Sequence, residues 1–202
     1  MAMDSQAKKE ISRDDPAPDP DIVDLTLKRW REIYNKEFIA LDYKITGLTP
    51  YVDHIIEVCA IKYENRVETD KYVTLVNPGG PIPSDTTRVN HITDNMVYGK
   101  PVISDVLGKL EDFIGNIPLA VYDPSIYIYF TIAEYKKNFT NQVLATQQAS
   151  KKHLSLPYNK LKIVLRHLGI DTEKLPREET DTKAIAEIVF KLIDICETKY
   201  GT

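Results

Sequence analysis

The chain has 202 residues, 43% hydrophobic and 28% charged, which is typical of a folded, water-soluble domain and excludes a disordered or membrane-embedded chain. The formal charge is −4, so attraction for nucleic acid requires a local basic patch. No apolar run reaches the roughly 18 residues of a membrane span, and the N-terminal segment has no apolar run of the kind that a secretory signal needs, so we expect a cytoplasmic location. Cys59 and Cys196 lie far apart in apolar segments, which predicts buried free thiols.

The N-terminal part divides into two segments. Residues 1–20 are rich in charge and proline and poor in apolar side chains, which predicts a disordered tail. Apolar residues then recur at the spacing of one helix face and predict an amphipathic helix over 21–36. They are Val23, Leu27, Trp30 and Tyr34. The main domain is expected over 37–200.

Three strands are expected next. The apolar run 38–41 predicts a buried strand that ends near 42–46, before Gly47. Two runs rich in β-branched and aromatic residues follow at 53–63 and 67–77. Because only three residues separate these runs, they predict a hairpin, and the domain opens with three antiparallel strands.

The remaining chain alternates between helical and strand patterns after a proline- and glycine-rich break at 78–83. We expect a short helix that begins at Asp94, with Thr93 as its cap. Further helices are expected over 102–113, ended by Gly115, over 125–137, over 158–168, ended by Gly169, and over 180–199. Strands are expected over 117–121 and 142–145. This order predicts a mixed α/β layer fold without internal repeats.

Asp42 and Lys44 stand at the end of the first expected strand. Side chains alternate along a strand, so both point to one face. A salt bridge beside a turn is one interpretation. A functional site at the strand end is the other.

Several segments carry a family likeness through their order and spacing. They are D-Y-K-I-T-G-L at 42–48, I-I-E-V-C-A at 55–60, L-V-N-P at 75–78, I-T-D-N-M-V at 92–97, the stretch 161–170, and D-T-K-A-I-A-E at 181–187. Over about residues 37–196 the chain resembles the DnaQ-like (DEDD) 3′-5′ exonucleases of the ribonuclease H-like fold. The resemblance implies a mixed five-stranded sheet, three antiparallel strands first, flanked by helices in three layers.

The resemblance also implies a chemistry, which this chain departs from. In the family, four carboxylates hold two Mg²⁺ or Mn²⁺ ions and a histidine, or a tyrosine in a sister branch, activates the water that cleaves the phosphodiester. Here Asp42 and Asp181 match the first and last aspartates. Lys44 takes the place of a glutamate, Tyr127 that of an aspartate, and Pro176 that of the histidine.

The remaining pair, Asp42 and Asp181, supplies about half of the family's negative charge, and Lys44 subtracts one more. We therefore hypothesise that the Lys44 ammonium lies between the two carboxylates, and we expect no cofactor and no metal. If an ion does bind, Asp42 and Asp181 are its expected ligands. Tyr127 is expected to pack inward or to bond to Asp42, and Pro176 has no proton acceptor in its side chain.

Other acids near the motifs are candidate replacement ligands. They are Asp123, Glu57, Glu178 and Glu179. We expect Asp123 to cap the helix that follows it, and Glu178 and Glu179 to lie on solvated surface.

Thr46, Gly47 and Leu48 match family residues that receive the 3′-terminal nucleotide, with the leucine as a wedge against a base. The competing interpretation is a turn with a buried leucine. A later basic region suits a phosphate backbone and stacked bases, or is simply a solvated helix face. It contains Lys136, Lys137, Lys151, Lys152, Lys160, Lys162 and Arg166, with Tyr135, Tyr158 and His167 nearby.

Together these features predict an exonuclease-like protein without catalysis that binds a protein partner or single-stranded nucleic acid. The alternative is an active metal-dependent 3′-5′ exonuclease that acts on DNA or RNA ends with a non-standard site. No membrane partner is expected, and the sequence leaves open whether the chain forms a homo-oligomer.

Overall fold

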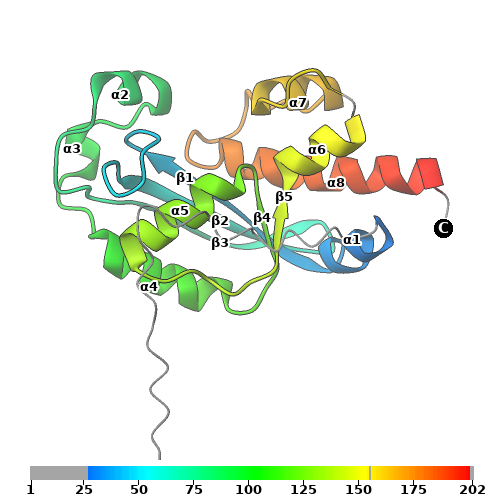
Figure 1. The fold of residues 1–202 in the computed structure, drawn as a ribbon, viewed down its shortest axis with the longest axis horizontal. Coiled ribbons are helices and arrows are strands. Elements are labelled where there is room, and N and C mark those ends of the chain that lie inside the picture. The colour runs from blue at the N-terminus through cyan, green and yellow to red at the C-terminus, as the bar shows by residue number, and fades with distance from the viewer. Residues whose placement is uncertain (1–26, 155, 201–202) are drawn as a thin grey trace, which may run out of the picture.

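Five strands form one mixed sheet in the order β3-β2-β1-β4-β5 (Figure 1). They are β1 (Glu37–Ile45), β2 (Ile55–Glu64), β3 (Val67–Leu75), β4 (Leu119–Val121) and β5 (Val143–Ala145). Strand β2 pairs antiparallel with β1 and β3, whereas β4 runs parallel to β1 and β5. The structure, a computed structural model, describes residues 27–154 and 156–200. The predicted sheet is confirmed.

The helices lie on both faces of this sheet (Figure 1). They are α1 (Leu27–Tyr34), α2 (Ser84–Asn90), α3 (Asp94–Val97), α4 (Ile103–Ile114), α5 (Pro124–Tyr135), α6 (Thr146–Leu154), α7 (Leu161–Leu168) and α8 (Thr180–Tyr200). Within the described ranges, none has the length and apolar character needed to cross a bilayer. The expected tail over 1–20 and the first part of the expected helix, 21–26, lie outside the described residues.

The hairpin between β2 and β3 closes through the two residues Asn65 and Arg66. Their φ angles are 51° and 67°, as a two-residue turn between twisted strands requires. The Arg66 guanidinium donates to the Asn35 Oδ1 and to the Asp194 Oδ1, each at 2.7 Å. The predicted hairpin is therefore present, with a loop one residue shorter than expected.

The two faces of β1 belong to different cores. Phe38 and Ala40 pack in a cluster with residues of α6, α7 and α8, whereas Leu41 and Tyr43 pack with residues of α4 and α5. This alternation continues to the strand end, so Asp42 points toward α8. Cys59 of β2 is a buried free thiol, as expected. The side chain of Cys196 lies outside the description.

Candidate functional site

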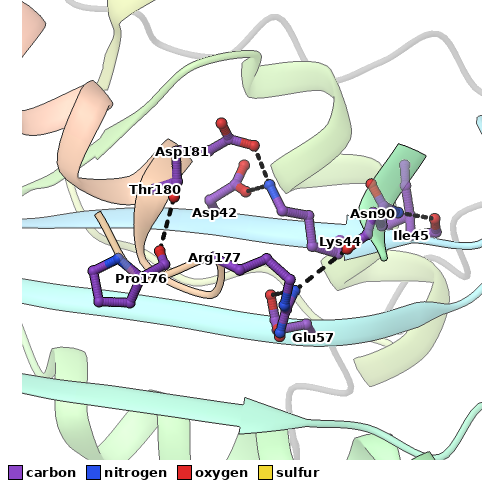
Figure 2. Close-up of polar contacts among 9 residues, drawn as sticks. All are labelled: Asp42, Lys44, Ile45, Glu57, Asn90, Pro176, Arg177, Thr180 and Asp181. Carbon is purple, nitrogen blue, oxygen red and sulfur yellow. Dashed lines mark hydrogen bonds and ion pairs between the residues drawn. The ribbon is translucent and has the colours of Figure 1, made fainter. Parts of the chain in front are cut away.

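The Lys44 ammonium lies between two carboxylates at the end of β1 (Figure 2). Its Nζ donates to the Asp42 Oδ2 at 2.7 Å and also to the Asp181 Oδ2. Only 15% of the Lys44 side chain is exposed. The structure thus brings these three residues together in the way that the sequence predicts.

Local structure explains why these side chains meet. The register of β1 against β2 shifts between Lys44 and Ile45, which ends the regular strand at this point. Asp181 lies in the first turn of α8, where the helix dipole favours a negative charge. The Thr180 hydroxyl donates to the Pro176 carbonyl at 2.7 Å and fixes the approach to this turn.

The ionisation of the three groups is coupled. Burial alone would lower the pKa of Lys44, but Asp42 and Asp181 outweigh it and the pKa is raised above its ordinary value. Burial raises the pKa of Asp42, and the Lys44 ammonium opposes this rise. At neutral pH Lys44 is therefore a permanent cation within this group.

A second buried ion pair lies next to this group. The Arg177 guanidinium donates to the Glu57 Oε1 at 3.1 Å and to the Glu57 Oε2 at 2.5 Å. Glu57 is 2% exposed and is the cross-strand neighbour of Lys44. Arg177 also donates to the Asn90 carbonyl at 3.5 Å, so it joins β2, α2 and the turn before α8 (Figure 2).

Sequence reasoning missed this pair. Burial raises the pKa of Glu57, and the Arg177 guanidinium opposes the rise. A glutamate inside the apolar run 55–60 was the available signal, because a buried carboxylate needs a partner. Its oxygens are occupied by Arg177, which removes Glu57 from the replacement ligands considered above.

The expectation that Glu179 is solvated is wrong. Only 7% of its side chain is exposed. Its carboxylate accepts from the Lys71 Nζ at 2.6 Å and contacts the Lys183 Nζ at 2.8 Å. Hydrogen bonds from Lys183 and Lys71 lower the pKa of Glu179 below its ordinary value. The charges of Lys71 and Lys183 offset the cost of burying the Glu179 carboxylate. Glu178 is partly exposed.

Tyr127 packs inward and does not bond to Asp42. Its ring centroid lies 6.1 Å from that of Tyr43 and 6.3 Å from that of Phe139. Its hydroxyl is buried and has no hydrogen-bond partner among the described residues. Asp123, four residues earlier, accepts from the Ser125 backbone N–H at 2.9 Å and caps α5 as predicted. Neither the Tyr127 hydroxyl nor the Asp123 carboxylate forms a hydrogen bond with the Lys44 ammonium.

Pro176 contributes only backbone to this region. Its side chain is exposed, and its carbonyl accepts from the Glu179 N–H at 3.0 Å as well as from Thr180. Nothing at this position offers a basic side-chain nitrogen or carboxylate.

A family model for this fold settles the relationship. The model RNase_T, described as Exonuclease, matches residues 39–189, which is more than half of the chain. The chain belongs to this exonuclease family. The resemblance to DnaQ-like exonucleases is thereby confirmed.

Individual relatives agree with this assignment. The chain is 29% identical over 181 residues to the DNA polymerase III subunit epsilon of Aquifex aeolicus (strain VF5), covering 87% of this chain and 90% of the relative. It is 33% identical over 162 residues to a PolC-type DNA polymerase III of Clostridium perfringens (strain 13 / Type A). That match covers 78% of this chain and 11% of the polymerase, so the chain spans about a tenth of that protein.

Solved structures share the fold. The nuclease domain of 3′hExo, a DEDDh family member bound to rAMP, aligns with a TM-score of 0.70 at 22% identity, over 81% of this chain and 95% of that one. Exonuclease X in complex with 5′ overhanging duplex DNA aligns with a TM-score of 0.62 at 18% identity, over 82% and 94%.

The loop after β1 of this exonuclease-family chain holds an exposed leucine. Leu48 is 80% exposed, which contradicts the interpretation of a turn around a buried leucine. Thr46 is buried, accepts from the His54 N–H at 2.9 Å and donates to the Asp53 Oδ1 at 3.2 Å. A Cβ at Gly47 would lie 2.5 Å from the Asp53 carboxylate, so a larger residue there would require that carboxylate to move. The loop is folded tightly around Asp53 and projects Leu48 outward.

A small cavity of about 110 Å³ opens beside the exonuclease-family motifs at the ends of β1 and β4. Asp42 and Tyr127 line it together with Leu161, the first residue of α7. The cavity therefore lies between the Asp42 carboxylate at the end of β1 and the helices α5 and α7.

Proposed function

We propose that this exonuclease-family chain has lost metal-dependent phosphodiester hydrolysis and acts by binding a protein partner or single-stranded nucleic acid. The observation that carries the proposal is the Lys44 ammonium, which bonds to both Asp42 and Asp181. These are the two acids that the chain shares with the family pattern.

A pair of divalent cations does not fit this donor set. Mg²⁺ and Mn²⁺ prefer hard oxygen ligands, and the two carboxylates present are neutralised in part by a fixed ammonium. Within the described ranges, no group of three or more His, Cys, Asp or Glu side chains is arranged to hold a metal ion. An entering ion would have to displace Lys44 and leave its charge unpaired.

Proton transfer lacks a participant as well. A general base must lie within hydrogen-bond reach of the attacking water. Pro176 stands at the position of the family histidine and offers only a carbonyl. Tyr127 has a hydroxyl whose pKa burial raises above its ordinary value, so it stays protonated.

The features that support binding lie on the rim of the site. Leu48 projects into solvent from a loop that Asp53 holds in shape. The Thr86 hydroxyl donates to the Thr46 carbonyl at 2.5 Å, which ties this loop to α2. A rigid loop with an exposed apolar tip suits contact with a base or with a protein surface.

The test combines metal titration with digestion of a labelled single-stranded oligonucleotide by the full chain. We expect Mg²⁺ and Mn²⁺ to leave the melting temperature unchanged and the oligonucleotide intact. An ion at about 100 times its dissociation constant would stabilise the fold by about 2.7 kcal/mol, which melting curves resolve. Degradation of the strand that Asp42→Ala abolishes would instead support the alternative, an active 3′-5′ exonuclease on DNA or RNA ends.

A further inference from the structure

Residues 136–170 carry a charge opposite to that of the remaining chain. They hold seven lysines and arginines and no aspartate or glutamate. Because the whole chain has a formal charge of −4 and this stretch +7, the remainder carries −11. The stretch includes α6 and α7, which lie together against α8 (Figure 1). The molecule is therefore strongly polarised in charge.

Four cations of α6, α7 and the residue before α7 are not neutralised by neighbouring acids, whereas Lys137 in the same stretch pairs with Glu111 at 2.7 Å. Lys151, Lys160, Lys162 and Arg166 are exposed, and none forms an ion pair with a carboxylate in the part of the chain that the structure describes. Lysines elsewhere behave differently. Lys62, Lys71 and Lys183 each contact two glutamates. Uncompensated cations on one face create a positive potential that attracts polyanions.

The basic face begins at the rim of the cavity. The Tyr122 hydroxyl at the end of β4 donates to the Asn159 carbonyl and fixes the segment before α7. That segment presents Tyr158, which is 68% exposed. Leu161 lines the cavity together with Asp42. The rim of the cavity is therefore continuous in sequence with the segment that carries Tyr158 and with the cations of α7.

We propose that α6, α7 and residues 156–160 form a track for the backbone of single-stranded nucleic acid, with Tyr158 as a stacking surface for a base. The inference rests on the proposed binding function and names its ligand class. Lys162 and Arg166 are four residues apart on α7, so their Cβ atoms lie about 5–6 Å apart on one helix face. An exposed aromatic among unpaired cations suits a strand whose bases stack while its phosphates are neutralised, and suits an acidic peptide less well.

The track is tested with the full chain and a fluorescein-labelled oligonucleotide of about 20 nucleotides, longer than the 4–16 nucleotides that such surfaces cover. Thymidine and uridine strands are titrated by anisotropy at several salt concentrations. We expect Lys160→Gln/Lys162→Gln/Arg166→Gln to weaken binding roughly tenfold or more at low salt and to reduce the salt slope by about 2, near 0.7 for each lost phosphate contact. Tyr158→Ala should weaken binding without changing the slope.

A matched control removes the same charge elsewhere. Lys100, Lys109 and Lys191 are exposed and lie outside the basic stretch. We expect Lys100→Gln/Lys109→Gln/Lys191→Gln to change affinity by less than about twofold, with the salt slope unchanged. Equal losses in both variants, or an unchanged slope in the track variant, would overturn the track.

Two further outcomes separate the track from the proposed function. If the chain ignores both oligonucleotides but binds polyglutamate through the same lysines, the ligand is an acidic protein, and the track fails while a binding function stands. If the track variant loses affinity and wild-type protein degrades the strand with Mg²⁺, the track stands and the loss of catalysis is wrong.

Discussion

At the residue scale, Lys44 places an ammonium at a position where the family pattern has a carboxylate. The family needs a concentration of negative charge that two cations neutralise. In this chain one side chain supplies the neutralising charge from within, bonded to Asp42 and Asp181. Because the pKa of Lys44 is raised, its contribution to stability is complete below its ordinary pKa of about 10.4 and is lost only at higher pH.

Lys44→Met should expose the dependence of the fold on this ammonium. It leaves Asp42 and Asp181 facing each other without a counter-ion, and we expect a loss of about 1–3 kcal/mol at pH 7, less than for a fully buried pair because Asp181 is partly exposed. The pKa of Asp42 is raised, so the folded state takes up a proton before the unfolded chain does. The deficit should therefore shrink as the pH falls toward about 4.

Urea unfolding at both pH values measures this loss. Lys62→Met is the matched control, because Lys62 also contacts two glutamates but on the surface of β2. It should cost less, and its deficit should disappear in moderate salt. A Lys44→Met protein as stable as wild type at pH 7 would contradict the counter-ion role.

Tyr127→Phe should leave stability unchanged or raise it by about 1 kcal/mol, since it removes a buried hydroxyl without a partner among the described residues. Tyr43→Phe is the comparison, because the Tyr43 hydroxyl lies 3.2 Å from the Thr131 Oγ1. That change should cost about 0.5–1.5 kcal/mol. Thermal unfolding separates the two. A Tyr127→Phe protein that is the less stable of the pair would show that this hydroxyl has a partner in solution.

At the scale of elements, one arginine joins three parts of the chain that are distant in sequence. Arg177 contacts Glu57 of β2 and the Asn90 carbonyl at the end of α2, and it lies three positions before the first residue of α8. The Arg177 side chain therefore ties the turn that carries Pro176 to β2 and α2. These contacts help to fix the positions of the ends of β1 and β2 near Lys44.

Arg177→Met leaves a buried carboxylate alone, since Glu57 is 2% exposed. We expect a loss of about 3 kcal/mol at pH 7. The pKa of Glu57 is raised, and removal of Arg177 raises it further. The folded variant therefore takes up a proton more readily than the unfolded chain as the pH falls. The loss of stability should then shrink toward pH 4–5, by about one kcal/mol or more. Glu57→Leu/Arg177→Met, measured by urea unfolding, should recover most of the stability. A double variant no better than Arg177→Met would contradict this explanation.

Glu179→Gln tests the second buried carboxylate, which Lys71 and Lys183 hold at the start of α8. The pKa of Glu179 is lowered in the folded state. Its contribution is therefore present above the ordinary value near 4.3 and is lost as the pH falls through the folded pKa. We expect a loss of about 1–3 kcal/mol at pH 7 that is smaller at pH 3. Melting curves with Glu178→Gln as control measure it, and an equal loss at both pH values would count against the ion pairs.

At the scale of the whole molecule, sequence patterns predicted the elements that bury an apolar face. The strands and the helices α4, α5, α7 and α8 carry such faces and lie close to their expected positions. Helix α2 was not predicted because it buries no residue and shows no apolar stripe. Helix α6 was missed because its sequence is mostly polar. Helix α6 buries Thr146, Ala149 and Ser150, so tertiary packing and not an apolar stripe defines it.

The site was predictable as far as strand alternation and family motifs reach. Strand alternation places Asp42 and Lys44 on one face, the family motifs add Asp181, and the three side chains meet as expected. The contact between Glu57 and Arg177 spans 120 positions, and no local pattern encodes which arginine meets a buried glutamate. Leu48 was ambiguous for a similar reason, because the exposure of a turn residue depends on the loop around Asp53.

Because the fold is shared, we predict that the metal site of the family can be rebuilt in this chain. The TM-score of 0.70 to the nuclease domain of 3′hExo shows that the two chains share the fold. We expect Lys44→Glu/Tyr127→Asp/Pro176→His to bind Mn²⁺, even without turnover, because four acids then surround the pocket. Saturating Mn²⁺ should raise its melting temperature by several degrees, about 2–4 °C for each kcal/mol.

The control is Lys44→Gln/Tyr127→Asn/Pro176→His, which has similar shapes but lacks the two added carboxylates and should not respond to Mn²⁺. Without metal the acidic variant should melt below wild type, since Tyr127 is 4% exposed and its replacement leaves a cavity with an unpaired acid. If it fails to fold, Lys44→Glu/Pro176→His keeps the tyrosine packing and still offers three acids. An identical response of acidic and amide variants to Mn²⁺ would show that charge in this pocket does not decide metal binding.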